Sequence, residues 1–224
     1  MKKVLYIVST PIGNYDDITL RAIKVLGSAD FIICEEFKEA RRLLSHLKIK
    51  KELFELNEHN ETESSIELFS KINTGKTAAL ISDCGTPLFS DPGHQLVKMC
   101  ISSGVQIIPI PGTDSLLPAL ICSGFNLDSF YYYGWLSPKK DIRRKQLLDL
   151  KKKKEVIVLM ETPYRLKTLL RDVVKIMGGE IPCVLAYELT KEKEKFYRGK
   201  TKQVLAVADN ENLKGEFVLI LNNS

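Results

Sequence analysis

The stretch that most constrains the fold is residues 80–93, where an apolar strand runs into a long loop and then into a helix. Residues 77–81 are apolar enough to be buried on both faces of a sheet, which is typical of a parallel strand. Two glycines and two prolines then prevent regular structure. Ordinary strand-to-helix connections take about 2 to 6 residues, whereas this one takes roughly ten. It is either a capped connection of unusual length or a ligand-binding loop, and the extra length favours a ligand at the carboxyl edge of the sheet.

Apolar strands alternate with helical patterns throughout residues 1–112, which predicts a doubly wound α/β domain. The strand at 4–8 runs directly into Ser-Thr-Pro-Ile-Gly-Asn, so this loop should share its sheet edge with the loop at 83–93. We expect Asp17 to cap the helix that follows. Beyond this region the alternation is less regular, and we expect residues 113–224 to form a second α/β domain with a mixed sheet.

Positive charge is concentrated in one segment, residues 138–154, which holds nine Lys or Arg against two Asp. This surplus exceeds the net charge of +5 of all 224 residues, so the rest of the chain is net negative. Such a segment is typical of a surface that binds a polyanion such as nucleic acid. It is equally typical of a solvated helix face, because leucines and an isoleucine supply an apolar side. Charge alone leaves both interpretations open.

The five cysteines are odd in number and widely spaced, and they form neither a CxxC motif nor a disulfide framework. We therefore expect a reducing, cytoplasmic environment and no metal site. No apolar segment is long enough to span a bilayer, so no membrane partner is expected.

Six motifs occur along the chain in a characteristic order. They are Leu5-Tyr-Ile-Val-Ser-Thr-Pro-Ile-Gly-Asn, Asp17-Ile-Thr-Leu-Arg-Ala, Ser82-Asp-Cys-Gly-Thr-Pro-Leu-Phe-Ser-Asp-Pro-Gly, Ile108-Pro-Ile-Pro-Gly, Glu161-Thr-Pro-Tyr-Arg and Glu188-Leu-Thr-Lys. Together they resemble the tetrapyrrole methylase superfamily, and within it the branch that methylates a cytidine ribose 2′-oxygen of small-subunit ribosomal RNA. The resemblance implies two α/β domains with S-adenosylmethionine in the cleft between them, a homodimer, and ribosomal RNA or the small ribosomal subunit as partner.

The chain has no GxGxG motif after its first strand, so the cofactor is not expected to bind as in the common Rossmann methyltransferases. The resemblance implies a different set of cofactor contacts. These residues are Pro11, Asp83, Gly85, Phe89, Ser90, Asp114, Ser115, Met160 and Ala186. Each has an alternative role in a turn or in the core, and this alternative is strongest for Met160 and Ala186.

A ribose hydroxyl is a very weak acid, so a carboxylate or another acceptor must orient it or accept its proton during methyl transfer. The candidate carboxylates are Glu35, Glu36, Glu161 and Glu188, and the sequence does not choose among them. From the residues alone, the favoured role for the first two is to stabilise a helix N-terminus with negative charge. Substrate phosphates could be held by Lys38, Lys139, Lys140, Arg143, Arg144 and Arg165.

Departures from the branch pattern leave the substrate open. Glu35-Glu36-Phe37-Lys38 stands where Glu-Asp-Thr-Arg is usual, so a hydroxyl is missing and a lysine replaces an arginine. Three hypotheses follow: an RNA ribose methyltransferase, a methyltransferase acting on a tetrapyrrole or corrin, and an RNA-binding relative that has lost catalysis. The basic segment favours the first over the second.

Overall fold

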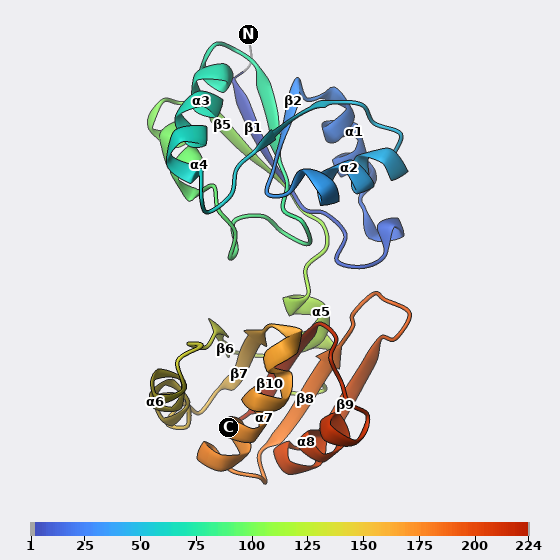
Figure 1. Ribbon diagram of the computed structural model, residues 1–224, viewed down its shortest axis with the longest axis vertical. Helices are drawn as coiled ribbons and strands as arrows, with labels where there is room; N and C mark the ends of the chain where they lie inside the picture. The colour runs from blue at the N-terminus through green and yellow to red at the C-terminus, as the bar shows by residue number, and fades with distance from the viewer. Residues whose placement is uncertain (1–2, 224) are drawn as a thin grey trace. The chain divides into compact units, whose positions relative to one another are not determined.

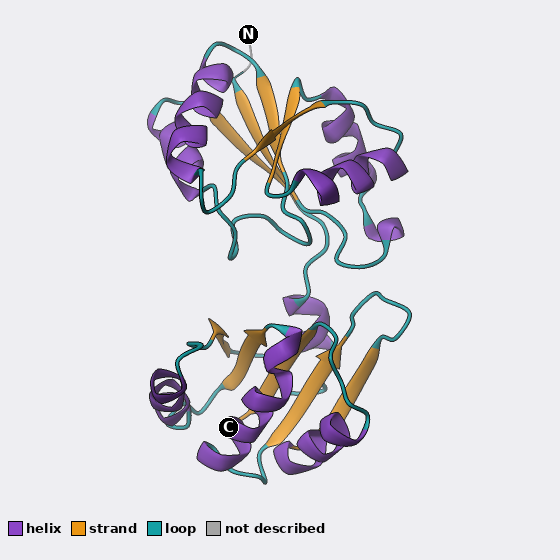
Figure 2. Ribbon diagram, viewed as in Figure 1, coloured by secondary structure: helices purple, strands orange, loops and turns teal. Residues whose placement is uncertain are grey.

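The computed structural model describes residues 3–223, which form two compact units that meet in the sequence between Asp114 and Ser115. Each unit contains one five-stranded sheet with helices packed on it, as Figures 1 and 2 show. The α/β fold class predicted from the sequence is confirmed.

The sheet of the first unit is parallel throughout, with strand order β3-β2-β4-β1-β5. Its strands are β1 (Val4–Val8), β2 (Phe31–Cys34), β3 (Glu52–Glu55), β4 (Thr77–Leu80) and β5 (Gln106–Ile110). Helices α1 (Leu20–Ser28) and α2 (Phe37–His46) lie on one face, and α3 (Glu61–Asn73) and α4 (His94–Ser102) lie on the other (Figure 1).

The central strands of this sheet are buried on both faces because helices cover both. In β2, Phe31 and Ile33 pack in the cluster that includes Leu68 of α3, whereas Ile32 and Cys34 pack in the other cluster with the residues of α1 and α2. This alternation gives a continuous apolar strand, as expected for a parallel sheet between two helical layers. All of these parallel strands end at one edge, so the loops that follow them meet there.

Helix α1 does not begin where the sequence suggested. Asp17 lies in a short 3-10 helix, η1 (Tyr15–Asp17), whose preceding residue Asn14 accepts a hydrogen bond from the amide of Asp16 at 3.0 Å. The cap of α1 is instead Thr19, whose hydroxyl accepts from the amide of Ala22 at 3.1 Å. The predicted cap was wrong because this extra turn delays the start of the helix by two residues.

The sheet of the second unit is mixed, with strand order β6-β7-β10-β8-β9. Only β6 and β7 are parallel; the other three pairs are antiparallel. The strands are β6 (Phe130–Trp135), β7 (Val156–Glu161), β8 (Pro182–Tyr187), β9 (Lys195–Lys200) and β10 (Phe217–Asn222). The helices are α5 (Leu116–Ile121), α6 (Lys140–Leu150), α7 (Leu166–Ile176) and α8 (Thr201–Asn210), with a 3-10 turn η2 (Pro163–Arg165) before α7.

Leucines from α6 and α7 pack with alternate residues of β7 and β10 to form the core of this unit. All five cysteines lie within residues 3–223, and no disulfide joins any two of them there. Within residues 3–223, no helix combines the length and the apolar character that crossing a bilayer requires.

Candidate functional site

The loops that follow β1 and β4 are joined at the carboxyl edge of the first sheet. Thr10 and Gly85 form an isolated antiparallel bridge, in which the Thr10 amide donates to the Gly85 carbonyl at 2.9 Å and the Gly85 amide donates to the Thr10 carbonyl at 3.1 Å. The Thr10 hydroxyl also donates to the Ser82 carbonyl at 3.2 Å. Beyond the ends of β1 and β4, these buried backbone groups have no partners in the sheet, and the hydrogen bonds between the loops satisfy them instead. The bonds hold the two loops together.

Side-chain hydroxyls extend this connection to the loop that follows β5. Thr86 Oγ1 donates to the Thr113 carbonyl at 3.2 Å, so the 2.9 Å contact between Ser9 Oγ and Thr86 Oγ1 is donated by Ser9. The Thr113 hydroxyl in turn donates to the Thr10 carbonyl at 2.7 Å. Sequence reasoning placed Thr86 at this edge but did not identify Ser9, Thr10 and Thr113. The signal that could have found them is the presence of Ser or Thr in each of the three loops that a parallel sheet brings to one edge.

Two glycines allow these loops to approach closely. Gly85 has φ +82°, and a Cβ there would lie 3.3 Å from a methyl of Ile12. At Gly112, a Cβ would lie only 2.9 Å from Cβ of Ser9. Both positions therefore need glycine, because a side chain would separate loops that pack closely here.

The cofactor residues predicted in the first unit all belong to these loops. Pro11 follows the bridge residue Thr10, and Gly85 is itself part of the bridge. Asp83 Oδ1 accepts a hydrogen bond from the amide of Glu36 at 3.2 Å, which ties the β4 loop to the end of β2. Phe89 and Ser90 lie further along the β4 loop, where the Phe89 ring is 54% exposed. Asp114 ends the first unit and Ser115 precedes α5.

The cofactor residues predicted in the second unit lie on neighbouring strands. Met160 of β7 and Ala186 of β8 both pair with Val218 of β10, so the three occupy one row across the sheet. Ala186 is fully buried and Met160 is half-buried. The structure thus brings this pair together, as it does the loop residues of the first unit.

An acidic hollow lies at the carboxyl end of β2, where Glu35 follows the last strand residue, Cys34. It has a volume of about 480 Å³ and is lined by Glu35, Glu36, Phe37, Lys38, Glu55, Asn57, Glu58 and His59. Burial, with the nearby charges of Asp83 and Asp91 adding to it, raises the pKa of Glu35 from its ordinary 4.5 to about 7. Burial also raises the pKa of Asp83. A half-buried carboxylate that gains and loses a proton near neutral pH is suited to general base catalysis.

Glu161 and Glu188, the other two candidate carboxylates, are held in place by contacts within the second unit. Glu161 is buried, with one oxygen accepting from the amide of Thr162 at 2.8 Å and the other 2.8 Å from the Arg165 guanidinium. Glu188 occupies a turn with φ +50° and accepts from the amide of Glu216 at 2.6 Å. Both contacts stabilise local structure. Glu35 and Glu36 are therefore the two candidates that line a hollow.

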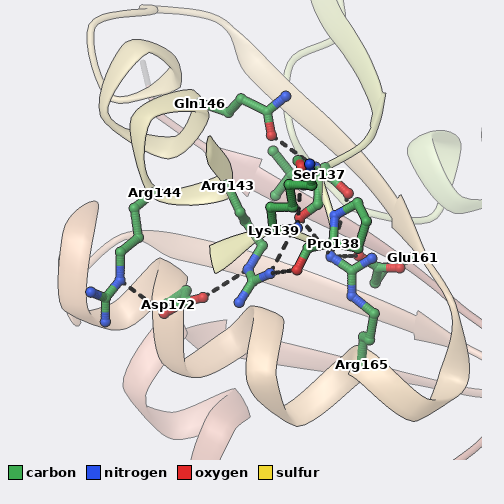
Figure 3. Close-up of polar contacts among 10 residues, drawn as sticks. Ser137, Pro138, Lys139, Arg143, Arg144, Gln146, Glu161, Arg165 and Asp172 are labelled. Carbon is green, nitrogen blue, oxygen red and sulfur yellow. Dashed lines mark hydrogen bonds and ion pairs between the residues drawn. The ribbon is translucent and has the colours of Figure 1, made fainter. Parts of the chain in front are cut away.

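The basic segment becomes helix α6 and the loop before it, and Figure 3 shows that Arg143 and Arg144 both point toward Asp172. The Arg143 side chain is 6% exposed; its Nε donates to Asp172 Oδ2 at 2.8 Å, and Nη1 donates to the carbonyls of Ser137 and Pro138 at 3.2 and 2.9 Å. This burial and these three hydrogen bonds argue against the predicted role of Arg143 as a ligand of a substrate phosphate. Arg144 lies at the edge of the same group, 3.8 Å from Asp172.

A second arginine, at the end of η2, holds the same loop. Arg165 donates to the Ser137 carbonyl at 3.0 Å while its guanidinium pairs with buried Glu161 (Figure 3). Of the phosphate ligands predicted in this segment, Lys139 and Lys140 are exposed, at the N-cap and the first residue of α6. Positive side chains are unfavourable at the positive end of a helix dipole, and a bound anion would offset this cost. Lys38 is similarly exposed in the first turn of α2.

Comparisons with known proteins agree on one family. A family model described as tetrapyrrole (corrin/porphyrin) methylases matches residues 4–205. The chain is 40% identical over 221 residues to ribosomal RNA small subunit methyltransferase I of Vibrio cholerae, covering 98% of this chain and 77% of the relative. It is 38% identical over 218 residues to the protein of that name from Thermotoga maritima, covering 97% of each chain.

Among solved structures, a uroporphyrin-III C-methyltransferase from Thermus thermophilus complexed with S-adenyl homocysteine has a TM-score of 0.68 to this chain. The match covers 97% of this chain and 96% of the other, at 16% identity. At that level of identity the likeness shows a shared fold.

The buried ion pair gives a prediction for stability. Asp172→Ala should destabilise the protein by about 3–5 kcal/mol, because it leaves the Arg143 guanidinium buried and unpaired. The double variant Arg143→Met/Asp172→Leu should lie within about 2 kcal/mol of the wild type, because it removes both charges and keeps apolar volume. Urea unfolding followed by circular dichroism measures both. Equal losses in the two variants would mean that packing, and not the uncompensated charge, dominates.

Proposed function

We propose that this chain, which belongs to the tetrapyrrole methylase family, transfers a methyl group from S-adenosylmethionine to a ribose 2′-hydroxyl of small-subunit ribosomal RNA. As a member of that family it is a methyltransferase. The observation that carries the RNA substrate is the identity of about 40% along almost the whole chain to relatives named for that substrate. The structure with a tetrapyrrole-modifying name is far more distant in sequence.

Bound S-adenosylmethionine would supply an electrophilic methyl group on a sulfonium, which is transferred by in-line displacement. The loops after β1, β4 and β5 fit such a group. Gly85 lets the loops after β1 and β4 meet without a side chain between them, and the exposed Phe89 ring offers an apolar surface to an adenine. We assign cofactor contact to Pro11, Asp83, Gly85, Phe89 and Ser90, together with Asp114, Ser115, Met160 and Ala186.

Glu35 is the carboxylate that orients the ribose hydroxyl and accepts its proton. A base is most effective when its pKa lies near the working pH, and Glu35 meets this condition with a pKa of about 7. It lines an open hollow, whereas Glu161 is buried against Arg165 and Glu188 supports a turn. Glu36 keeps a supporting role, since its amide holds Asp83 in place.

Lys38, Lys139 and Lys140 hold substrate phosphates, with Arg144 at the margin of the buried group. Lys139 and Lys140 are exposed where the amides of α6 begin, an arrangement that favours phosphate. Arg165 acts indirectly by fixing the loop that carries Lys139. A ribosomal substrate also places the enzyme in the cytoplasm, and we propose that it works as a homodimer.

Two alternative functions can be distinguished from this one by experiment. The family name and the shared fold favour a tetrapyrrole or corrin acceptor as the second candidate. The third is an RNA-binding relative without catalysis, because Phe37 and Lys38 replace the usual threonine and arginine beside the acidic pair.

Incubation with radiolabelled S-adenosylmethionine separates these functions. Label should enter the RNA of small ribosomal subunits, and neither a tetrapyrrole precursor nor buffer controls should take it up. Alkaline hydrolysis should then leave the labelled linkage intact, because a methylated 2′-oxygen cannot attack the neighbouring phosphate. Label in ordinary mononucleotides would overturn the ribose assignment, and label only in the tetrapyrrole would establish the second candidate.

Replacement of Glu35 should remove the proton acceptor. In the wild type, kcat should rise from pH 6 to 8 with a midpoint near 7, because the carboxyl is protonated below its pKa of about 7 and charged above it. Glu35→Gln should lower kcat by about 10²–10⁴-fold at pH 8 and abolish this rise. Glu39→Gln, on the surface of α2, is the matched control and should retain both. A Glu35→Gln enzyme with the normal profile would exclude Glu35 as the base.

Substitution at Gly85 should weaken cofactor binding. Gly85→Ala places a Cβ 3.3 Å from Ile12 in a left-handed backbone conformation, so the loop must shift. We expect at least a tenfold loss of S-adenosylmethionine affinity by calorimetry. Gly27→Ala is the control, because a Cβ at that helical position meets nothing within 4 Å. Equal affinity in both variants would remove the β4 loop from the site.

A further inference from the structure

A second cationic surface surrounds α2, outside the segment that charge alone identified. Residues 37–51 hold six Lys or Arg against a single Glu. Apart from Lys38, the sequence did not single them out, because they are spread over a helix, the turn after it and the residues just before β3. The cations are Lys38, Arg41, Arg42, Lys48, Lys50 and Lys51.

These cations line two adjoining hollows in the surface of the first unit. One, of about 670 Å³, is lined by Tyr15, Lys38, Arg41, Arg42 and Ser45. The other, of about 650 Å³, is lined by Phe37, Arg41, Leu44, Ser45, Lys48, Ile49, Lys50, Lys51 and Leu53. Because Arg41 and Ser45 line both, the hollows form one groove along α2, which we call the α2 groove.

The amphipathic spacing of α2 explains why the cations face outward together. Ala40, Leu43 and Leu44 are buried toward the sheet, while Lys38, Arg41 and Ser45 recur every three or four residues on the exposed side. The Arg41 guanidinium lies 5.2 Å from the centre of the Phe37 ring. At the opposite rim, Tyr15 stacks on His46 with ring centres 4.6 Å apart. The groove thus combines cations with aromatic rings, the combination that binds single-stranded nucleic acid.

Few of these positive charges are neutralised by the protein. The pair of Arg42 with Glu39, at 3.0 Å, is the only ion pair that the six cations form within residues 3–223. Lys51 donates to the carbonyl of Ala29 at 2.6 Å. The groove therefore keeps most of its positive potential available for a polyanion.

The charge changes sign at the N-terminal end of α2. Lys38 lines the groove and also lines the acidic hollow that contains Glu35 and Glu36. A phosphate is attracted to the groove and repelled by the carboxylates, whereas an uncharged ribose hydroxyl can enter the hollow at little electrostatic cost. The boundary at Lys38 therefore separates the charged part of a nucleotide chain from its neutral part.

We propose that the α2 groove binds the phosphodiester backbone of the RNA substrate next to the nucleotide that is methylated. This inference rests on the proposed function, since it names where that substrate lies on the first unit. The backbone follows Lys48, Arg41 and Lys38 along the helix, and an unpaired base stacks near Tyr15. The carboxylates of the acidic hollow repel the phosphates, so the atoms of the RNA that reach Glu35 are uncharged ones.

The test compares two variants that each lose two positive charges. Arg41→Ala/Lys48→Ala removes cations of the groove. Lys76→Ala/Lys98→Ala is the matched control: both lysines are exposed, neither lines a hollow, and Lys98 is on α4, on the opposite face of the sheet (Figure 1). Binding of small-subunit ribosomal RNA fragments is measured from 50 to about 200 mM salt, where counterion release dominates.

The groove variant should bind RNA about tenfold more weakly than the control at 0.1 M salt. Its plot of log affinity against log salt should be shallower by about 1 to 2, since each phosphate contact contributes roughly 0.7–0.9. Melting temperature and S-adenosylmethionine affinity should match the control, which excludes misfolding. Equal RNA affinity and equal slopes in the two variants would overturn the groove.

Label transfer by the same proteins separates this inference from the proposed function. If the wild type labels ribosomal RNA and both variants bind it equally, the groove is wrong and the methylation stands. If RNA affinity depends on the groove but label enters only another acceptor, RNA binding by the groove is supported. The proposed methylation of RNA is then wrong. If the wild type neither binds nor labels RNA, both are wrong.

Discussion

The paired backbone hydrogen bonds between Thr10 and Gly85 fix the geometry on which the candidate site depends. A parallel sheet brings the loops after its strands to one edge, but it does not by itself determine their conformation. Here the bridge locks the β1 loop to the β4 loop, and the hydroxyls of Ser9, Thr86 and Thr113 attach the loop after β5. Each bond uses a polar group that would otherwise be left without a partner at the end of a strand. The ligand-facing surface is therefore preorganised, with little mobile chain to order on binding.

The sequence predicted the fold and the location of the loops because both depend on local patterns. Apolar strands, Gly and Pro are visible in a window of a few residues, and they identified the loop around Gly85 correctly. The same approach could not reveal that Arg143 is buried, because its partner Asp172 lies on another helix 29 residues later. A run of positively charged residues gives the same sequence pattern whether a given side chain faces solvent or a carboxylate.

The α2 groove was missed for the opposite reason. Its cations do not form a run, and only the packing of Ala40, Leu43 and Leu44 against the sheet turns them to one side. The cap of α1 was misplaced because the extra turn at Tyr15–Asp17 has no strong sequence signature. Likewise, the four candidate carboxylates look alike in sequence. What distinguishes Glu35 is partial burial beside Asp83 and Asp91, which is a property of the folded chain.

The buried pair of Arg143 with Asp172 has a consequence for how the second unit responds to its surroundings. Salt screens charges that face solvent but hardly affects a pair from which water is excluded. In concentrated electrolyte, Lys139 and Lys140 would lose much of their attraction for phosphate, yet the Ser137 and Pro138 carbonyls would still be held by Arg143. Salt thus weakens the attraction of this edge for phosphate but leaves the conformation of its backbone unchanged. If a nucleic-acid strand binds here, as we propose, an ionic change of the medium would release it and leave the backbone of this edge in place.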